Sequence, residues 1–117
     1  MSNSVRTNNY TLGKGTGITS SETTKTHYVG GARGYSVLVK LTDNGGAAGS
    51  VSLRAGLSKD DMIIDAGTVA AMAFTTGVQR ILYNISAVAY GIVDVDIIMA
   101  GGDLDYEVFI TVIEGES

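Results

Sequence analysis

The chain has 117 residues, enough to bury about two thirds of its unfolded surface in one core without a metal or a disulfide. It contains no cysteine and one histidine, which excludes a disulfide framework, a zinc ribbon and a thiol nucleophile. The net charge of −4 argues against nucleic acid as a partner, because binding phosphates requires clustered Lys and Arg.

No segment has the pattern that targeting to a membrane requires. Residues 1–10 lack the apolar core of a signal peptide, and the later apolar runs are far shorter than a membrane span. We therefore expect a chain that is made in a cytoplasm and has no membrane partner.

The composition favours an all-β fold. Sixteen glycines, no proline and many Thr, Ser and Val residues suit short strands linked by glycine turns. The charge is divided unevenly, with +4 on residues 1–58 and −8 on residues 59–117. This asymmetry suits head-to-tail self-association or docking on a charged surface, and equally a sandwich with one acidic end.

Residues 1–26 are predicted to form a flexible, polar N-terminal arm, and residues 27–117 a single folded domain. The arm is rich in Ser, Thr, Asn and Gly, so it cannot bury enough apolar surface to order itself. We expect a short strand near residues 10–13, and ordering only against the arm's own domain or against a neighbour. The sizeable apolar residues of the arm are Val5, Tyr10, Leu12 and Ile18.

The first half of the domain holds two segments with the alternation of half-buried strands. Residues 27–34 supply a short strand and a glycine turn, and residues 35–42 and 50–56 alternate between apolar and polar positions. Because the glycine-rich residues 43–49 separate the two alternating segments, we predict that they form a hairpin. The predicted inward residues are Tyr35, Val37, Val39 and Leu41, then Val51, Leu53 and Ala55.

The second half continues in the same way. Residues 62–66 and 68–74 are short apolar pieces, and we favour a strand over a helix for the second because it is short for a helix. Residues 78–88 are a predicted strand with Ile81, Tyr83 and Ile85 on one face. Residues 91–101 and 104–115 are predicted to form a last hairpin across Gly101 and Gly102. About eight short strands at this spacing predict a single β-sandwich or jelly-roll-like domain.

Five carboxylates around the Gly101 and Gly102 pair raise the question of a cation site. They are Asp94, Asp96, Asp103, Asp105 and Glu107. Alternation places Val93, Val95 and Ile97 inward, and Asp94 and Asp96 outward. A calcium site needs about six to eight oxygens that converge on one point, and a linear row of outward carboxylates does not converge. We therefore predict a solvated or interface-facing acidic strand pair, with no metal and no cofactor.

No group of residues has the types and spacing of an active site, so we predict that the chain is not an enzyme. No nucleophile elbow accompanies His27, which favours a surface residue that makes hydrogen bonds. Residues 13–17 are glycine-rich but lack the features of a phosphate-binding loop. The absence of Trp weighs against a glycosidase and against an alternative function as a carbohydrate-binding β-sandwich module.

The last strands carry apolar residues on both faces. Phe109 and Ile113 lie opposite the core-facing set, and Ile92 and Ile98 flank the outward aspartates. A monomeric sandwich normally keeps one face polar, so this surface indicates contact with a segment of the same chain or with another subunit. We favour another subunit and predict an interface formed by Tyr10, Leu12, Ile18, Ile92, Ile98, Phe109 and Ile113.

The order of strands and turns over residues 35–100 resembles small β-sandwich virion proteins of tailed phages, particularly head decoration or cement proteins. The segments that carry the resemblance are VSLRAGLSKDD, TVAAMAF, NISAVAYG and VDVDIIMAG. The resemblance implies a virion subunit that binds the outside of the assembled capsid, often as a trimer. Its partners would be the major capsid protein and itself, and the N-terminal arm would add a strand to the lattice. The alternatives are another virion component, such as a tail or fibre protein, and a filament subunit.

Overall fold

The computed structural model describes residues 5–64, 72–86 and 91–115, and all regular structure within them is β-strand, which confirms the predicted all-β class. All strand pairs are antiparallel and belong to one sheet. No helix in these ranges has the length and apolarity needed to cross a membrane. The strands are β1 (Val5–Ile18), β2 (Glu22–Thr23), β3 (His27–Tyr28), β4 (Gly34–Gly56), β5 (Met62–Ile64), β6 (Met72–Ala73), β7 (Val78–Ile85) and β8 (Ile92–Gly115).

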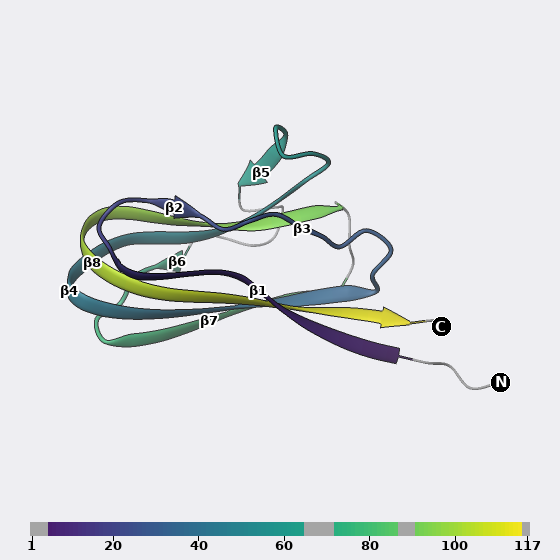
Figure 1. Ribbon diagram of the computed structural model, residues 1–117, viewed down its shortest axis with the longest axis horizontal. Coiled ribbons are helices and arrows are strands. Elements are labelled where there is room, and N and C mark those ends of the chain that lie inside the picture. The colour runs from purple at the N-terminus through teal and green to yellow at the C-terminus, as the bar shows by residue number, and fades with distance from the viewer. Residues whose placement is uncertain (1–4, 65–71, 87–90, 116–117) are drawn as a thin grey trace.

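Two long strands, β4 and β8, organise the sheet. They pair with each other along nearly their whole lengths, from Gly34 opposite Ile113 to Gly56 opposite Ile92. The resulting ribbon curves back on itself, so that its two halves become the centres of two facing layers (Figure 1). In the first layer β1 flanks β8 and β7 flanks β4; in the second, β2 and β3 flank β8, and β5 and β6 flank β4.

A single hydrophobic core lies between the two layers. The alternating pattern of both long strands points one set of side chains into this core, as the sequence predicts. From β7, Ile81 and Tyr83 join it, and the Tyr83 hydroxyl donates a 3.4 Å hydrogen bond to the Val51 carbonyl of the opposite layer. The buried hydrophobic residues of the long strands are Tyr35, Val37, Val39, Leu41, Val51, Leu53, Ala55, Val93, Val95, Ile97, Leu104, Tyr106, Val108, Ile110 and Val112.

The two predicted hairpins are wrong, because both glycine-rich segments bend a strand instead of reversing it. Residues 43–49 and the Gly101 and Gly102 pair lie opposite each other in the ribbon, where the register shifts three times between Asp43 and Gly49. Such bulges bend a strand and increase its twist. Gly46, Gly49 and Gly102 have positive φ, which glycine adopts without strain. The segments on either side of each bend therefore pair with the other long strand, not with each other.

The structure orders most of the predicted N-terminal arm in one of the two ways expected of it, with a strand longer than the predicted residues 10–13. The arm is ordered against its own domain as β1, which pairs with β8 from Val5 opposite Gly115 to Ile18 opposite Leu104. Leu12 and Ile18 lie in the core, 2% and 8% exposed, so neither offers surface to another subunit. The edge of β8 orders this polar segment through backbone hydrogen bonds, which composition does not reveal.

The alanine-rich segment 68–74 lies mostly outside the described residues, but its Met72 and Ala73 form strand β6. The strand predicted over residues 78–88 is present as β7, and residues 87 and 88 lie outside the described ranges.

Gly102 provides a test of the bend. Its φ is 79°, and a Cβ atom there would lie 2.3 Å from the Gly46 carbonyl carbon, so we expect Gly102→Ala to lower the free energy of unfolding by about 2 kcal/mol or more. Gly101→Ala is the matched control, because a Cβ at Gly101 meets nothing within 4 Å, and it should change stability by less than about 0.5 kcal/mol. Urea denaturation of both variants measures the difference; equal effects would contradict this account of the bend.

Candidate functional site

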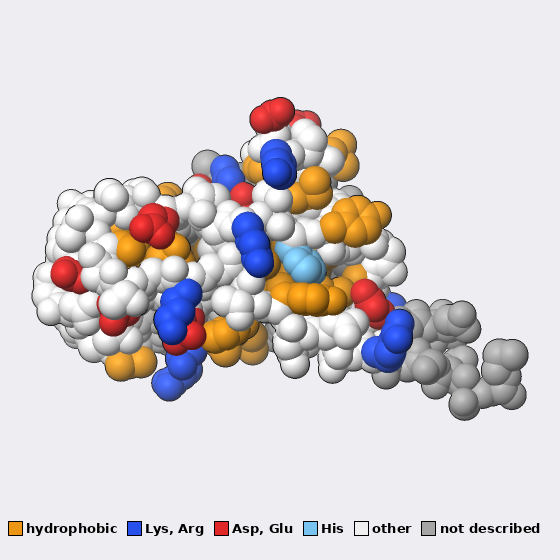
Figure 2. All heavy atoms as spheres, in the orientation of Figure 1, with side chains coloured by type: hydrophobic (Ala, Val, Ile, Leu, Met, Phe, Trp, Pro, Cys, Tyr) orange, Lys and Arg blue, Asp and Glu red, His pale blue; other side chains and the backbone are white. Residues whose placement is uncertain are grey.

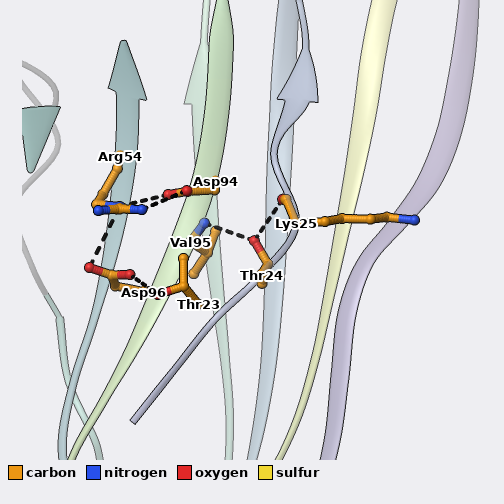
Figure 3. A network of polar contacts seen from close by, with 7 residues as sticks. All are labelled: Thr23, Thr24, Lys25, Arg54, Asp94, Val95 and Asp96. Atoms are coloured by element: carbon orange, nitrogen blue, oxygen red, sulfur yellow. Dashed lines mark hydrogen bonds and ion pairs between the residues drawn. The ribbon is translucent and has the colours of Figure 1, made fainter. Parts of the chain in front are cut away.

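The carboxylates singled out in the sequence do not form one site. Asp94 of β8 lies directly opposite Arg54 of β4, whose Nε and Nη2 atoms donate hydrogen bonds of 2.7 and 2.6 Å to its two carboxylate oxygens (Figure 3). Asp96 lies beside them, with Oδ2 3.6 Å from Arg54 Nε and Oδ1 accepting a 2.6 Å bond from the Thr23 hydroxyl. Together these groups join the central strands of the second layer to β2.

The burial of Asp94 differs from the predicted acidic strand pair, which was expected to face solvent or a partner. Asp94 points away from the core valines, as alternation requires, yet it is only 2% exposed. Its hydrogen bonds raise the pKa of Arg54 further above the ordinary value, and the bidentate geometry satisfies both charges within the chain. A carboxylate that is already neutralised in this way is a structural group, because little of its charge is left for a cation.

The neighbouring segment after β2 is fixed to β8 by Thr24, which is 7% exposed. Its backbone N–H donates to the Val95 carbonyl at 2.9 Å, and its hydroxyl accepts a 3.0 Å bond from the Val95 N–H. Thr24 therefore continues the pairing of β2 with β8 at a point where no regular strand is present.

Two further acids of this stretch, Asp103 and Asp105, hold the bend. Asn44 Nδ2 donates to Asp103 Oδ1 at 3.1 Å and to Asp105 Oδ1 at 2.7 Å, and the Gly17 N–H donates to the same Asp105 oxygen at 2.7 Å. The bond from Gly17 and then the one from Asn44 lower the pKa of Asp105 below its ordinary value. Among the described residues no three His, Cys, Asp or Glu side chains are grouped closely enough to hold a metal ion.

His27 contacts an aromatic ring. Its ring centroid lies 4.5 Å from that of Tyr10, with an angle of 41° between the planes, so β3 of one layer touches β1 of the other. Figure 2 shows hydrophobic side chains beside the histidine on this face. Partial burial, and then the charge of Lys25, lower the pKa of His27. The contact links the open edges of the two layers.

The outer face of the first layer carries an exposed apolar row. Phe109 of β8 pairs with Leu38 of β4, which pairs with Leu82 of β7. Leu82 is 58% exposed, and Leu38 and Phe109 are partly exposed. We call these three residues the outer row. It continues across the layer to Thr11 of β1, which pairs with Phe109.

Polar rows flank the outer row on both sides. The row toward the bend is charged, and the row on the other side is uncharged and has two internal hydrogen bonds of 2.6 Å, from Thr111 to Asn9 and from Ser36 to Asn84. The charged row consists of Lys14, Glu107, Lys40 and Arg80. An apolar centre with a polar rim is the usual composition of a protein contact.

The predicted interface residues are spread over several surfaces. Phe109 lies in the outer row, and Ile113 lies on the same face, where it lines a groove of about 410 Å³ together with Arg33 and Ile85. Ile92 is half-buried and Ile98 is 40% exposed, both on the second layer. Tyr10, 43% exposed, lies beside His27.

Sequence reasoning missed Leu38 and Leu82. Both are apolar residues on the otherwise polar side of their strands, and this was the available signal. Only the register of β7, β4 and β8 places them beside Phe109.

The fold and the outer row define an all-β protein with an exposed apolar row on one face of its sheet. No protein-family model matches the chain, and no curated protein matches it. Among solved structures, the chain is similar to the SPBc2 prophage-derived protein YomS, with a TM-score of 0.59 and 14% sequence identity. The similarity covers 94% of this chain and 95% of YomS. The two proteins therefore share a fold over nearly their full lengths.

The ion pair of Arg54 and Asp94 can be tested by removing one charge. Because Asp94 is buried and Arg54 would lose its partner, Asp94→Asn should lower the free energy of unfolding by about 3 kcal/mol in urea denaturation. Asp96→Asn is the control, since its oxygen lies 3.6 Å from Arg54, and should cost about 1 kcal/mol. A loss for Asp94→Asn no larger than the control would contradict a structural role for the pair.

Tyr106 should make the fold sensitive to alkaline pH. Burial, and then its 2.7 Å hydrogen bond to Glu22, raise its pKa from 10.0 to about 12, so the folded state favours the neutral phenol. That stability is present below pH 10 and is lost as the pH rises from about 10 to about 12. Burial also raises the pKa of Tyr35 to about 12.

In Tyr106→Phe we therefore expect a shallower loss of stability over this pH range, with the remaining loss due to Tyr35. Urea denaturation at several pH values measures the slope. If the stability of the variant fell with pH as steeply as that of the wild type, Tyr106 would not be the source of the alkaline sensitivity.

Proposed function

We propose that the chain is a non-enzymatic structural subunit of a tailed-phage particle, which binds the assembled capsid as a decoration protein and associates with itself. The observation that carries this function is the outer row on the first layer. Leu38, Leu82 and Phe109 form a continuous apolar strip in water, and burying such surface releases about 25 cal/mol per Å².

The rim around the outer row supports a protein partner of defined charge. In the charged row, Lys14, Lys40 and Arg80 outnumber Glu107, although the chain as a whole is acidic. Asp105 lies on the same face nearer the bend, where it accepts hydrogen bonds from within the chain. A partner surface with apolar groups and carboxylates would fit this face, and complementary charges would set the orientation and speed the encounter. Such binding weakens as the salt concentration rises.

Two likenesses support a phage particle as the assembly. The fold is shared over nearly the full length with YomS, which is a prophage-derived protein. The sequence pattern of residues 35–100 resembles that of decoration proteins of phage heads. Subunits of this kind act by binding and need no catalytic group.

Fractionation of the source particle tests this function. Gradient-purified particles, separated into heads and tails, are analysed by mass spectrometry. We expect the chain in intact particles and in the head fraction. Recovery with tails alone would replace the decoration role with that of a tail component, and absence from purified particles would overturn a virion function.

Leu38→Ser tests the outer row directly. We expect at least about tenfold weaker binding to particles that lack the chain, because a central apolar contact is lost. Leu57→Ser is the control, since Leu57 is 71% exposed on the loop between β4 and β5, away from the outer row, and its binding should match the wild type. Unfolding curves verify that both variants are folded. Equal binding by both would eliminate the outer row as the docking surface.

A further inference from the structure

We propose that the edge strand β7 pairs with β7 of a second copy of this chain, antiparallel and around a two-fold axis, so that two first layers become one continuous sheet. This pairing rests on the proposed function, which includes self-association. It assigns the surface, the symmetry and the register of that contact.

The first layer has two edge strands, β1 and β7, which differ in how regularly they pair with their neighbours. At the β1 edge the pairing with β8 is interrupted twice, between Thr11 and Gly13 and between Gly15 and Ile18. Lys14 lies between these irregularities, and Gly17 has a φ of 61°. Bulges and an edge lysine are the usual means by which proteins prevent further strand pairing. The β1 edge is therefore protected.

The β7 edge has none of these devices. Its eight residues pair with β4 in an unbroken register, from Tyr35 opposite Ile85 to Thr42 opposite Val78. The strand contains no proline or glycine, and Arg80 is its one charged residue. Among the described strands β7 pairs with β4 alone, and Figure 1 shows it at the border of the sheet. A long, regular edge strand of this kind is a template for another strand.

The register follows from the side chains. A two-fold axis perpendicular to the sheet keeps outer residues on the outer side, so outer residues must pair with outer residues. When the axis passes through Leu82, that residue meets its own copy and Arg80 meets Asn84 twice. An axis through Arg80 would place like charges opposite each other, and an axis through Ile81 would place Leu82 against Arg80. An axis through Tyr83 would place Leu82 against Asn84. Of these four central registers, the one centred on Leu82 alone pairs an outer apolar residue with another and opposes no charges.

The side chains of this register are compatible with pairing. Leu82, 58% exposed in the single chain, becomes covered by its copy. The side-chain oxygen of Asn84, Oδ1, accepts one hydrogen bond from the Ser36 hydroxyl. Its second lone pair remains for the guanidinium of Arg80 from the other copy. This self-complementarity identifies a second copy, in preference to an unrelated strand, as the occupant of the edge.

The pairing would also join two outer rows. Phe109, Leu38 and Leu82 of one copy would continue into Leu82, Leu38 and Phe109 of the other, because all lie on the same side of the combined sheet. A particle surface would then meet a doubled strip, and two linked contacts bind far more tightly than one.

Charge substitution at the axis is a sharp test, because Leu82 faces itself. By light scattering, the wild type should reach twice the chain mass of 12.1 kDa as its concentration rises. Leu82→Lys alone and Leu82→Glu alone should remain at 12.1 kDa, and an equal mixture of the two should recover the doubled mass. Leu57→Lys, at another exposed leucine, should dimerise like the wild type.

A cross-link gives a second readout. The natural chain has no cysteine, so Leu82→Cys should form a disulfide-linked dimer on mild oxidation, much faster than Leu57→Cys. A monomeric wild type at all concentrations, a dimer that tolerates Leu82→Lys, or equal oxidation of both cysteine variants would overturn the pairing. Detection of the chain in purified particles separates this failure from failure of the proposed function, since a monomer can still bind through Leu38 and Phe109.

Discussion

The pairing of β4 with β8 is the constraint on which the rest of the structure depends. These two strands supply the centre of both layers, and every other strand is attached to one of them: β1, β2 and β3 to β8, and β5, β6 and β7 to β4. The bend in this ribbon sets the two inner faces against each other, so one register determines both the sheet and the core. The Arg54 and Asp94 pair and the contacts of Asn44 with Asp103 and Asp105 lie across this same ribbon.

Local alternation predicted which side chains enter the core, because a period of two depends only on neighbouring residues. The buried sets Val37 with Val39, Val51 with Leu53, and Val93 with Val95 follow from it directly. Alternation did not predict whether the chain reverses or continues at the glycine segments. Glycine permits a bulge as readily as a reversal, and the choice is made by a partner strand about 50 to 60 residues away in the chain.

In the candidate site, too, local pattern predicted some features, and pairing with distant strands determined the others. Apolar residues on both faces of the last strands predicted apolar surface outside the core, and the structure places Phe109 on such a surface. The partners of Phe109 could not be found, because Leu38 and Leu82 become its neighbours only through two strand registers. Burial of Asp94 was equally hidden: alternation gives the face of a residue, but not the arginine across the sheet that neutralises it.

The order in which the strands are synthesised has a consequence for folding. β1, β2, β3 and β4 all leave the ribosome before β8, their shared partner, has been made. Neither layer can therefore close around its centre before its half of β8 has been synthesised. Because the two layers share β4, β8 and one core, the chain should acquire both together, slowly, from pairings that are distant in sequence.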